Sequence, residues 1–265
     1  MTNVISSFQN PRIKNLLLLQ QKSRERRKQQ LVVVEGLREI GIAVSNDFKL
    51  VQLYVCPEIA DPASFASLSD NDNTTFISKA VFETLAYREG SDGCIAVLEP
   101  KNLSLIDVKL RATPLLIVLE AVEKPGNLGA ILRTADAVQA DAVIICDPLT
   151  DLYNPNVIRS SIGCIFALQV VTCSSVEAMS WLKEHKFTTY AAELTASRPY
   201  HQFDYTCPTA FVLGTEADGL TQQWIDFCDH RVIIPMSGSI DSLNVSVSTA
   251  VLAFEALRQR DFSIK

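Results

Sequence analysis

Apolar and polar residues alternate along the chain in two blocks, which a polar stretch at residues 99–113 separates. In the first block, short apolar runs of strand type alternate with helix-favouring stretches. These lie at residues 31–34, 37–44, 50–56, 62–68, 74–77, 79–86 and 94–98. Such alternation within about 100 residues is typical of a small α/β domain. The pattern therefore predicts an N-terminal domain at residues 1–100 and a linker at residues 101–113.

The alternation restarts after Pro114 with runs that are apolar at nearly every position, such as residues 115–119 and 142–146, with a helix near 128–138 between them. Strands that are covered on both faces of a parallel sheet have this continuous pattern. Further strands are predicted at residues 167–171, 187–191, 209–213 and 231–234, and further helices at 175–185, 221–227 and 243–258. We predict a second α/β domain at residues 114–265.

The chain has an ordinary globular balance, with 48% apolar and 20% charged residues. No uninterrupted apolar run exceeds five residues, whereas a spanning helix needs about 18. The first residues lack the basic and long apolar segments of a secretory signal. Seven cysteines without a CxxC pair stand mostly in apolar strings, which favours reduced, buried thiols. We expect a cytoplasmic protein without membrane association.

Charge is distributed unevenly along the chain. The 265 residues include 24 basic and 30 acidic side chains, a net charge of −6. Residues 1–40 hold eight basic and three acidic residues, a balance of +5, which leaves −11 for the remainder. A basic helix is predicted over residues 10–30. A polyanion would bind first to the basic run of this helix, which contains Arg24, Arg26, Arg27 and Lys28. A solvated helix face without a partner explains the same charges.

Common motifs for nucleotide, metal and hydrolase chemistry are missing from the sequence. It contains no GxG and no GxxxxGK[ST], which argues against a Rossmann-type dinucleotide site and against a P-loop. The histidines, His185, His201 and His230, lie at no metal-ligand spacing with one another or with a cysteine, so we predict no metal site. A Ser-His-Asp triad has no GxSxG to anchor it.

A glycine-containing segment at residues 123–135 directly follows the first strand of the second block. Its two glycines permit a close backbone approach where the strand turns into a helix. Asn127 falls on that turn and Arg133 on the second turn of the helix. A helix cap with a surface arginine is the alternative explanation.

Two further polar segments follow later predicted strands. Residues 212–220 form a strand and a loop that holds Glu216 between two glycines. Residues 233–247 form a strand, a polar loop and a helix that is predicted to begin near Ser242. Asp241 or Ser242 would serve as a helix N-cap, but such a cap leaves Asn244 unexplained.

Together these segments resemble the signature of the SpoU, or TrmH-type, RNA ribose methyltransferases of the SPOUT superfamily. The patterns N-x-G-x-I-x-R-T-A, G-x-E-x-x-G-L and I-P-M-x-G-x-x-x-S-L-N-V-S-V occur in the family's order, at residues 127–135, 214–220 and 234–247. Residues 154–163 resemble the family's NPxxxRxSxG segment and add Arg159 to the candidate RNA-binding residues.

The first domain is also similar to a part of the family's proteins, the ribosomal-protein-like substrate-binding module. The similarity lies at residues 10–14, 34–38 and 93–97, so the resemblance covers nearly the whole chain. In this family the catalytic domain is an open, mainly parallel sheet whose C-terminal part is threaded into a trefoil knot. General rules of chain topology would have discouraged such a knot.

The resemblance also implies a cofactor and an assembly. In the family, S-adenosylmethionine is bent inside the knot and is held largely by backbone groups of the second and third segments. Family members are typically homodimers with the active site near the interface, and here the helix after Ser242 is expected to take part. Carried over by position, the cofactor-binding residues are Leu213, Gly214, Ile234, Met236 and Leu243.

The catalytic residues that the resemblance implies are Asn127, Arg133, Glu216, Ser242 and Asn244. Methyl transfer to a ribose hydroxyl requires the two reactants to be held in line and the hydroxyl to lose its proton. Because a guanidinium stays protonated in proteins, we expect Arg133 to grip the phosphate beside the target ribose rather than to act as a base. Glu216 is a candidate for accepting the proton or for holding Arg133.

These observations predict an S-adenosylmethionine-dependent RNA 2′-O-methyltransferase, with ribosomal RNA favoured by analogy to the two-domain members of the family. A tRNA 2′-O-methyltransferase, an enzyme that methylates a base nitrogen and a non-catalytic RNA-binding ribosome-assembly factor are the alternatives. The assembly factor is disfavoured because loss of activity usually removes some of the implied catalytic residues, and all of them are present.

Overall fold

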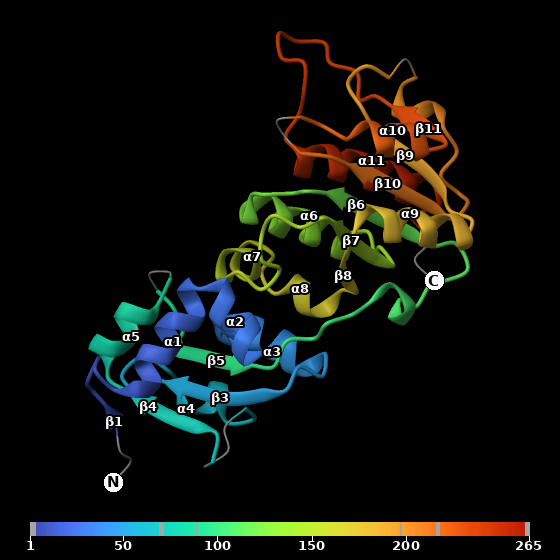
Figure 1. Ribbon diagram of the computed structural model, residues 1–265. Coiled ribbons are helices and arrows are strands. Elements are labelled where there is room, and N and C mark those ends of the chain that lie inside the picture. The colour runs from blue at the N-terminus through green and yellow to red at the C-terminus, as the bar shows by residue number, and fades with distance from the viewer. Residues whose placement is uncertain (1–3, 69–71, 88–89, 197, 216–217, 263–265) are drawn as a thin grey trace. The chain divides into compact units, whose positions relative to one another are not determined.

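The computed structural model describes residues 4–68, 72–87, 90–196, 198–215 and 218–262, and the chain divides into two compact units (Figure 1). Unit 1 comprises residues 1–101 and 151–167, and unit 2 comprises residues 102–150 and 168–265. Residues 151–167 thus group with the N-terminal part of the chain, although the sequence pattern placed them in the span 114–265. No helix in the described part of the chain is long and apolar enough to cross a membrane.

Unit 1 is built on a five-stranded sheet in the order β1-β4-β3-β5-β2. The strands are β1 (Val4–Ile5), β2 (Val32–Glu35), β3 (Leu50–Val55), β4 (Thr74–Ile77) and β5 (Cys94–Leu98). β4 runs parallel to β1 and β3, whereas β5 runs antiparallel to β2 and β3. Four of these strands coincide with the predicted apolar runs, and β1 was not predicted.

Helices surround this sheet and include two from residues 151–167. They are α1 (Pro11–Gln21), α2 (Ser23–Gln29), α3 (Leu37–Ser45), α4 (Pro62–Phe65), α5 (Lys79–Leu85), α7 (Pro155–Ser160) and α8 (Cys164–Ala167). Ile13, Leu16 and Leu19 of α1 pack with Phe82 of α5 in the core. α7 packs against β2 and α8 against α3, which explains why the 151–167 segment belongs to unit 1.

The single helix predicted over residues 10–30 is two helices. Lys22 takes an extended conformation (φ −119°, ψ 108°) between α1 and α2. The Arg26 guanidinium reaches back from α2 and donates hydrogen bonds to the carbonyl oxygens of Leu19 and Gln20 at the end of α1. These bonds satisfy carbonyls that a helix end leaves without intrahelical partners, so they stabilise the break.

Unit 2 contains a six-stranded sheet in the order β11-β9-β10-β6-β7-β8, and every neighbouring pair of strands is parallel. The strands are β6 (Leu115–Glu120), β7 (Ala142–Cys146), β8 (Val170–Cys173), β9 (Thr188–Ala192), β10 (Thr209–Leu213) and β11 (His230–Val232). β6, β7 and β10 are buried along their whole length, as their continuous apolar sequence predicted.

Helices cover both faces of the parallel sheet. They are α6 (Pro125–Ala137), α9 (Ser175–Glu184), α10 (Gln222–Phe227) and α11 (Val245–Gln259). α9 and α10 pack on one face, where Trp181 and Trp224 join the buried side chains of the strands. α6 and α11 pack against each other and contact β7 and β10. Unit 2 is therefore a three-layer α/β structure, which confirms the predicted mainly parallel sheet.

All seven cysteines are free thiols, as predicted, but their burial differs from the prediction. Cys56, Cys94 and Cys146 are buried, whereas Cys164, Cys173, Cys207 and Cys228 are only half-buried. Cys173 and Cys207 stand outside the apolar strings, the first between Thr and Ser and the second between Thr and Pro, and Cys164 begins the short helix α8.

Candidate active site

The parallel sheet of unit 2 has a topological switch point between β6 and β10. The chain proceeds from β6 to β7 and β8 on one side, whereas β10, β9 and β11 lie on the other side. The helices that follow β6 and β10 pack toward opposite faces, so the carboxyl ends of these two strands leave a crevice between them. Open α/β sheets bind their ligands at such a point.

A cavity of about 340 Å³ lies at the carboxyl ends of β9, β10 and β11. All five residues predicted to bind the cofactor line it, namely Leu213, Gly214, Ile234, Met236 and Leu243. Its volume falls in the range of about 300–1,000 Å³ that is usual for ligand pockets. The structure thus brings the second and third sequence segments together around one cavity.

Gly214 lies at the wall of this cavity, in close contact with another part of the backbone. A Cβ at this position would overlap the backbone of Gly219 and Leu220. Thr215 and Gly219 exchange two backbone hydrogen bonds, with N···O distances of 3.0 and 3.1 Å, and Gly219 has a positive φ of +70°. Gly214 is therefore required first by the close approach of Gly219 and Leu220, which themselves line the cavity.

A second cavity of about 120 Å³ adjoins the first at the switch point. Asn127 lines it together with residues that directly follow β6, namely Val122, Glu123 and Lys124. The two cavities share four lining residues, Gly214, Thr215, Asp218 and Val245. A group bound in one cavity would therefore face a group bound in the other across this common wall.

Asn127 and Asn244 connect the first and third sequence segments. The Asn244 side-chain amide donates a hydrogen bond to the Asn127 side-chain oxygen, with an N···O distance of 3.2 Å. The other end of the Asn244 amide caps α11, because its oxygen accepts from the Ser246 backbone N–H (2.9 Å) and hydroxyl (2.6 Å). The predicted helix start near Ser242 was two residues early, since Asn244 is the N-cap.

The remaining predicted catalytic residues lie in different places. Ser242 is exposed, donates a hydrogen bond to Asp241 (3.1 Å) and lines the larger cavity. Arg133 is exposed on α6 and is not among the described residues that line the two cavities. It lies six positions after Asn127, which corresponds to a rise of about 9 Å along the helix axis. Glu216 lies outside the described residues.

The basic residues proposed for RNA binding are not equivalent. Arg24, Arg27 and Lys28 are exposed on α2. Arg26 is only 5% exposed and pairs with Asp151 in addition to the end of α1. Its sequence position in a basic run therefore misled the prediction, because its charge is used inside unit 1 and is not on the surface.

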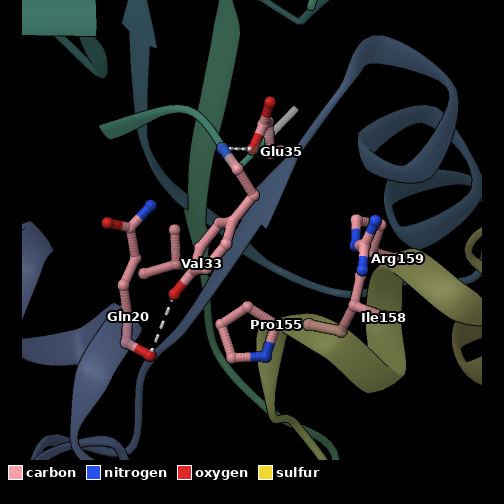
Figure 2. Close-up of a pocket in the computed structure, with 7 residues that line it drawn as sticks. Gln20, Val33, Glu35, Pro155, Ile158 and Arg159 are labelled. Atoms are coloured by element: carbon pink, nitrogen blue, oxygen red, sulfur yellow. Dashed lines mark hydrogen bonds between the residues drawn. The ribbon is translucent and has the colours of Figure 1, made fainter. Parts of the chain in front are cut away.

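Arg159 is exposed on α7, where it donates a hydrogen bond to Asn156 with an N···O distance of 3.5 Å. It lines a small pocket of unit 1 with Gln20, Val33, Glu35, Tyr87, Pro155 and Ile158 (Figure 2). Inside the pocket the Tyr87 hydroxyl donates to the Gln20 carbonyl and the Tyr87 backbone N–H to Glu35. With a volume of about 20 Å³ this pocket has room for about one water molecule.

Some cavity residues were missed by the sequence analysis. Asp218 lines both cavities, and Glu193 lines the larger one from the end of β9. Asp218 stands inside the second sequence segment, so its carboxylate was available as a candidate. Glu193 follows an ordinary strand, and its sequence surroundings gave no signal.

Comparison with known proteins agrees with this arrangement of segments. Residues 114–254 match the SpoU rRNA Methylase family, and residues 10–96 match the MRM3-like substrate binding domain. The chain belongs to the SpoU rRNA methylase family. The family match begins one residue before β6 and includes both cavities, whereas the substrate-binding match spans α1 to β5.

Relatives with established names share most of the chain. The 23S rRNA (guanosine-2′-O-)-methyltransferase RlmB of Bordetella pertussis is 36% identical, over 85% of this chain and 91% of the relative. The 23S rRNA (uridine(2479)-2′-O)-methyltransferase of Streptomyces viridochromogenes is 30% identical, over 86% of this chain and 83% of the relative. The crystal structure of AviRb from Streptomyces viridochromogenes in complex with AdoMet has a TM-score of 0.87 and 28% identity, and the match covers 97% of this chain and 100% of AviRb.

Proposed function

We propose that this protein transfers a methyl group from S-adenosylmethionine to a ribose 2′-hydroxyl of ribosomal RNA. The observation that carries the proposal is the pair of adjoining cavities, one lined by the second and third family segments and the other by Asn127 of the first. The relatives support ribosomal RNA because they are named as 23S rRNA 2′-O-methyltransferases. Their names specify ribose methylation at different nucleosides, guanosine and uridine, so the proposal concerns the ribose and not a particular base.

The larger cavity fits the cofactor in size and in chemistry. The backbone of Gly219 and Leu220 passes too close to the β10 end to admit a side chain at Gly214, and both glycines line the cavity without a side chain. When bound, S-adenosylmethionine supplies an electrophilic methyl group on a sulfonium sulfur, which departs as a neutral thioether. Leu213, Ile234, Met236 and Leu243 exclude water from the apolar parts of this site.

The smaller cavity is proposed to receive the target ribose. Asn127 and Asn244 would orient the 2′-hydroxyl toward the shared wall, so that its oxygen attacks the methyl carbon in line with the leaving sulfur. Ser242 lies on the cofactor side, and Glu216 retains the role of accepting the hydroxyl proton or holding Arg133. We assign Arg133 to the phosphate next to this ribose, where a planar guanidinium binds two oxygens at once.

The N-terminal and C-terminal parts of the chain are proposed to have different functions. Residues 1–100 would bind the RNA, and residues 114–265 would form the methyltransferase domain with the family's trefoil knot. Residues 101–113 would link these two domains. Arg24, Arg27, Lys28 and Arg159 are exposed and would contact phosphates. The proposal places the protein in the cytoplasm, in keeping with its free thiols.

We also propose a homodimer in which α11 takes part. Val247 and Phe254 of α11 are 46% and 44% exposed although they are apolar. They are seven residues apart and therefore share one face of the helix. Sedimentation should give the mass of two chains, and Phe254→Glu should shift the protein toward the mass of one chain.

A direct test uses purified protein, labelled S-adenosylmethionine and protein-free ribosomal RNA. Digestion to nucleosides and mass spectrometry should reveal a labelled 2′-O-methylnucleoside. Label on a base would indicate a different reaction, and binding of RNA without any label would favour an assembly factor. Transfer RNA in a parallel reaction distinguishes the two RNA classes.

A further inference from the structure

Glu193 is a carboxylate inside the larger cavity whose hydrogen-bonding capacity is only half used. It directly follows β9, and its backbone N–H donates to the Val232 carbonyl of β11 (3.0 Å). One carboxylate oxygen, Oε1, accepts a hydrogen bond from the Thr195 hydroxyl. The other, Oε2, is buried and accepts none from the described residues.

One half-exposed ion pair, without a hydrogen bond, compensates the charge of Glu193. The Arg231 guanidinium nitrogen Nε lies 3.8 Å from Oε2, beyond hydrogen-bond distance, and its side chain is 49% exposed. None of the described residues that line this cavity is a lysine, arginine or histidine, and two more carboxylates, Asp218 and Asp241, line it. A buried acceptor without a donor is unfavourable, so Oε2 is suited to a donor that arrives with a ligand.

We propose that Glu193 is a cofactor-binding residue that accepts hydrogen bonds from the ribose 2′- and 3′-hydroxyls of S-adenosylmethionine. This inference rests on the proposed function. The reactive methyl group must face the smaller cavity, which adjoins the larger one at Gly214, Thr215, Asp218 and Val245. Glu193 instead lies on the β9–β11 side of the larger cavity and is absent from the shared wall. It is therefore placed to hold a part of the cofactor that does not react.

The vicinal hydroxyls fit this oxygen better than a single donor does. A free carboxylate oxygen has two lone pairs, and a vicinal diol offers two adjacent O–H donors. Acidic side chains at strand ends recognise ribose hydroxyls in the same manner in dinucleotide-binding folds. Thr195 engages the other oxygen and so restricts the rotation of the carboxylate.

Calorimetry with unmodified and deoxygenated ligands tests the assignment. Glu193→Gln should weaken S-adenosylmethionine binding about 10- to 100-fold, the scale of losing a hydrogen bond to a charged group. The 2′-deoxy and 3′-deoxy analogues of S-adenosylhomocysteine should bind wild type more weakly than the parent compound, whereas the variant should barely distinguish them. Glu184→Gln, an equal charge change at the exposed end of α9, should bind like wild type.

Each other outcome has a definite meaning. Wild-type affinity in Glu193→Gln, with the thermal unfolding midpoint of the free protein unchanged, overturns the inference. Equal losses on deoxygenation in wild type and variant also overturn it, because Glu193 would then contact the adenine amine or the methionine ammonium. If wild type itself binds no S-adenosylmethionine, the proposed function fails first.

Discussion

Asn244 donates a hydrogen bond to Asn127 across 117 residues of sequence, and this contact joins the start of α11 to the start of α6. Asn127 lines the smaller cavity, and Asn244 stands between Leu243 and Val245, which both line the larger one. The same Asn244 side chain caps α11 through Ser246. One amide therefore connects the fold of the helix start to the orientation of a proposed catalytic side chain.

We predict that this pair acts as a unit in methyl transfer. Asn127→Ala and Asn244→Ala should each lower the rate at least about tenfold, and the double variant should be little worse than the more severe single variant. Residues in direct contact commonly show such non-additivity. A double-mutant cycle on single-turnover rates measures it, and strictly multiplicative losses would mean that the two side chains act independently.

A matched substitution separates the cap from the contact. Asn244→Asp retains the oxygen that accepts from Ser246 but removes the donor to Asn127. Because aspartate caps helices as well as asparagine does, the unfolding free energy of the Asn244→Asp protein should stay near wild type. That of the Asn244→Ala protein should be lower by about 1 kcal/mol. Both variants should be slow in methyl transfer.

Arg133 is predicted to act on the RNA and not on the cofactor. It is exposed on α6 and lines neither cavity among the described residues, so Arg133→Ala should leave S-adenosylmethionine affinity unchanged. Methyl transfer should fall at least about a hundredfold, the scale of losing one charge-stabilising donor. Calorimetry and single-turnover kinetics measure the two effects, and intact turnover would return Arg133 to an ordinary surface residue.

Arg133→Lys distinguishes two ways in which this cation could work. Lysine keeps the positive charge but lacks the planar fork that binds two phosphate oxygens. Activity close to wild type would indicate simple charge attraction. A loss as deep as that of Arg133→Ala would support the bidentate grip.

The basic face of α2 is predicted to set the salt dependence of RNA binding. Neutralising Arg24, Arg27 and Lys28 together should flatten the slope of log affinity against log salt, by up to about 0.7–0.9 for each phosphate that the protein no longer neutralises. Binding titrations at several salt concentrations give the slope. If it stays the same, α2 does not bind the RNA backbone.

Arg26 provides the contrast within the same helix. Its guanidinium is buried against Asp151 and the end of α1, so Arg26→Gln should lower the stability of unit 1. Removing one partner of a buried ion pair destabilises by about 3–5 kcal/mol. Denaturant unfolding should register this loss, whereas an Arg26→Gln protein of wild-type stability would contradict the buried pairing.

Gly214 is predicted to tolerate no side chain, because the backbone of Gly219 and Leu220 lies against it. Gly214→Ala should weaken S-adenosylmethionine binding strongly, because its Cβ would force the backbone of Gly219 and Leu220 out of the cavity wall. Gly41→Ala on α3 is the matched control, since a Cβ there meets nothing within 4 Å and Gly41 lines neither cavity. Calorimetry on both variants decides the matter, and equal affinities would contradict the close approach.

Much of the fold followed from local pattern. Strands β6, β7 and β10 are apolar along nearly their whole length because helices cover both faces of the sheet. Their continuous apolar sequence therefore predicts their burial. The break at Lys22 was not visible, because it depends on Arg26 reaching back to α1. Helices α7 and α8 were missed since they are short and find their stability in packing against unit 1.

Some features of the site could likewise be predicted from local sequence, and others could not. The residues of the larger cavity could be predicted because most of them stand in contiguous segments with family patterns. The contact between Asn127 and Asn244 required the topology that brings α6 and α11 together. Glu193 had no sequence signal, because a glutamate after a strand is common and only the cavity reveals its free oxygen.

The most direct test of the central claim is a map of 2′-O-methylation over total RNA from a strain that lacks this protein. We predict that one ribose methyl mark in ribosomal RNA disappears, returns with the wild-type gene and stays absent with Asn127→Ala. An unchanged ribosomal RNA map, or a missing mark that lies in transfer RNA, would contradict the account.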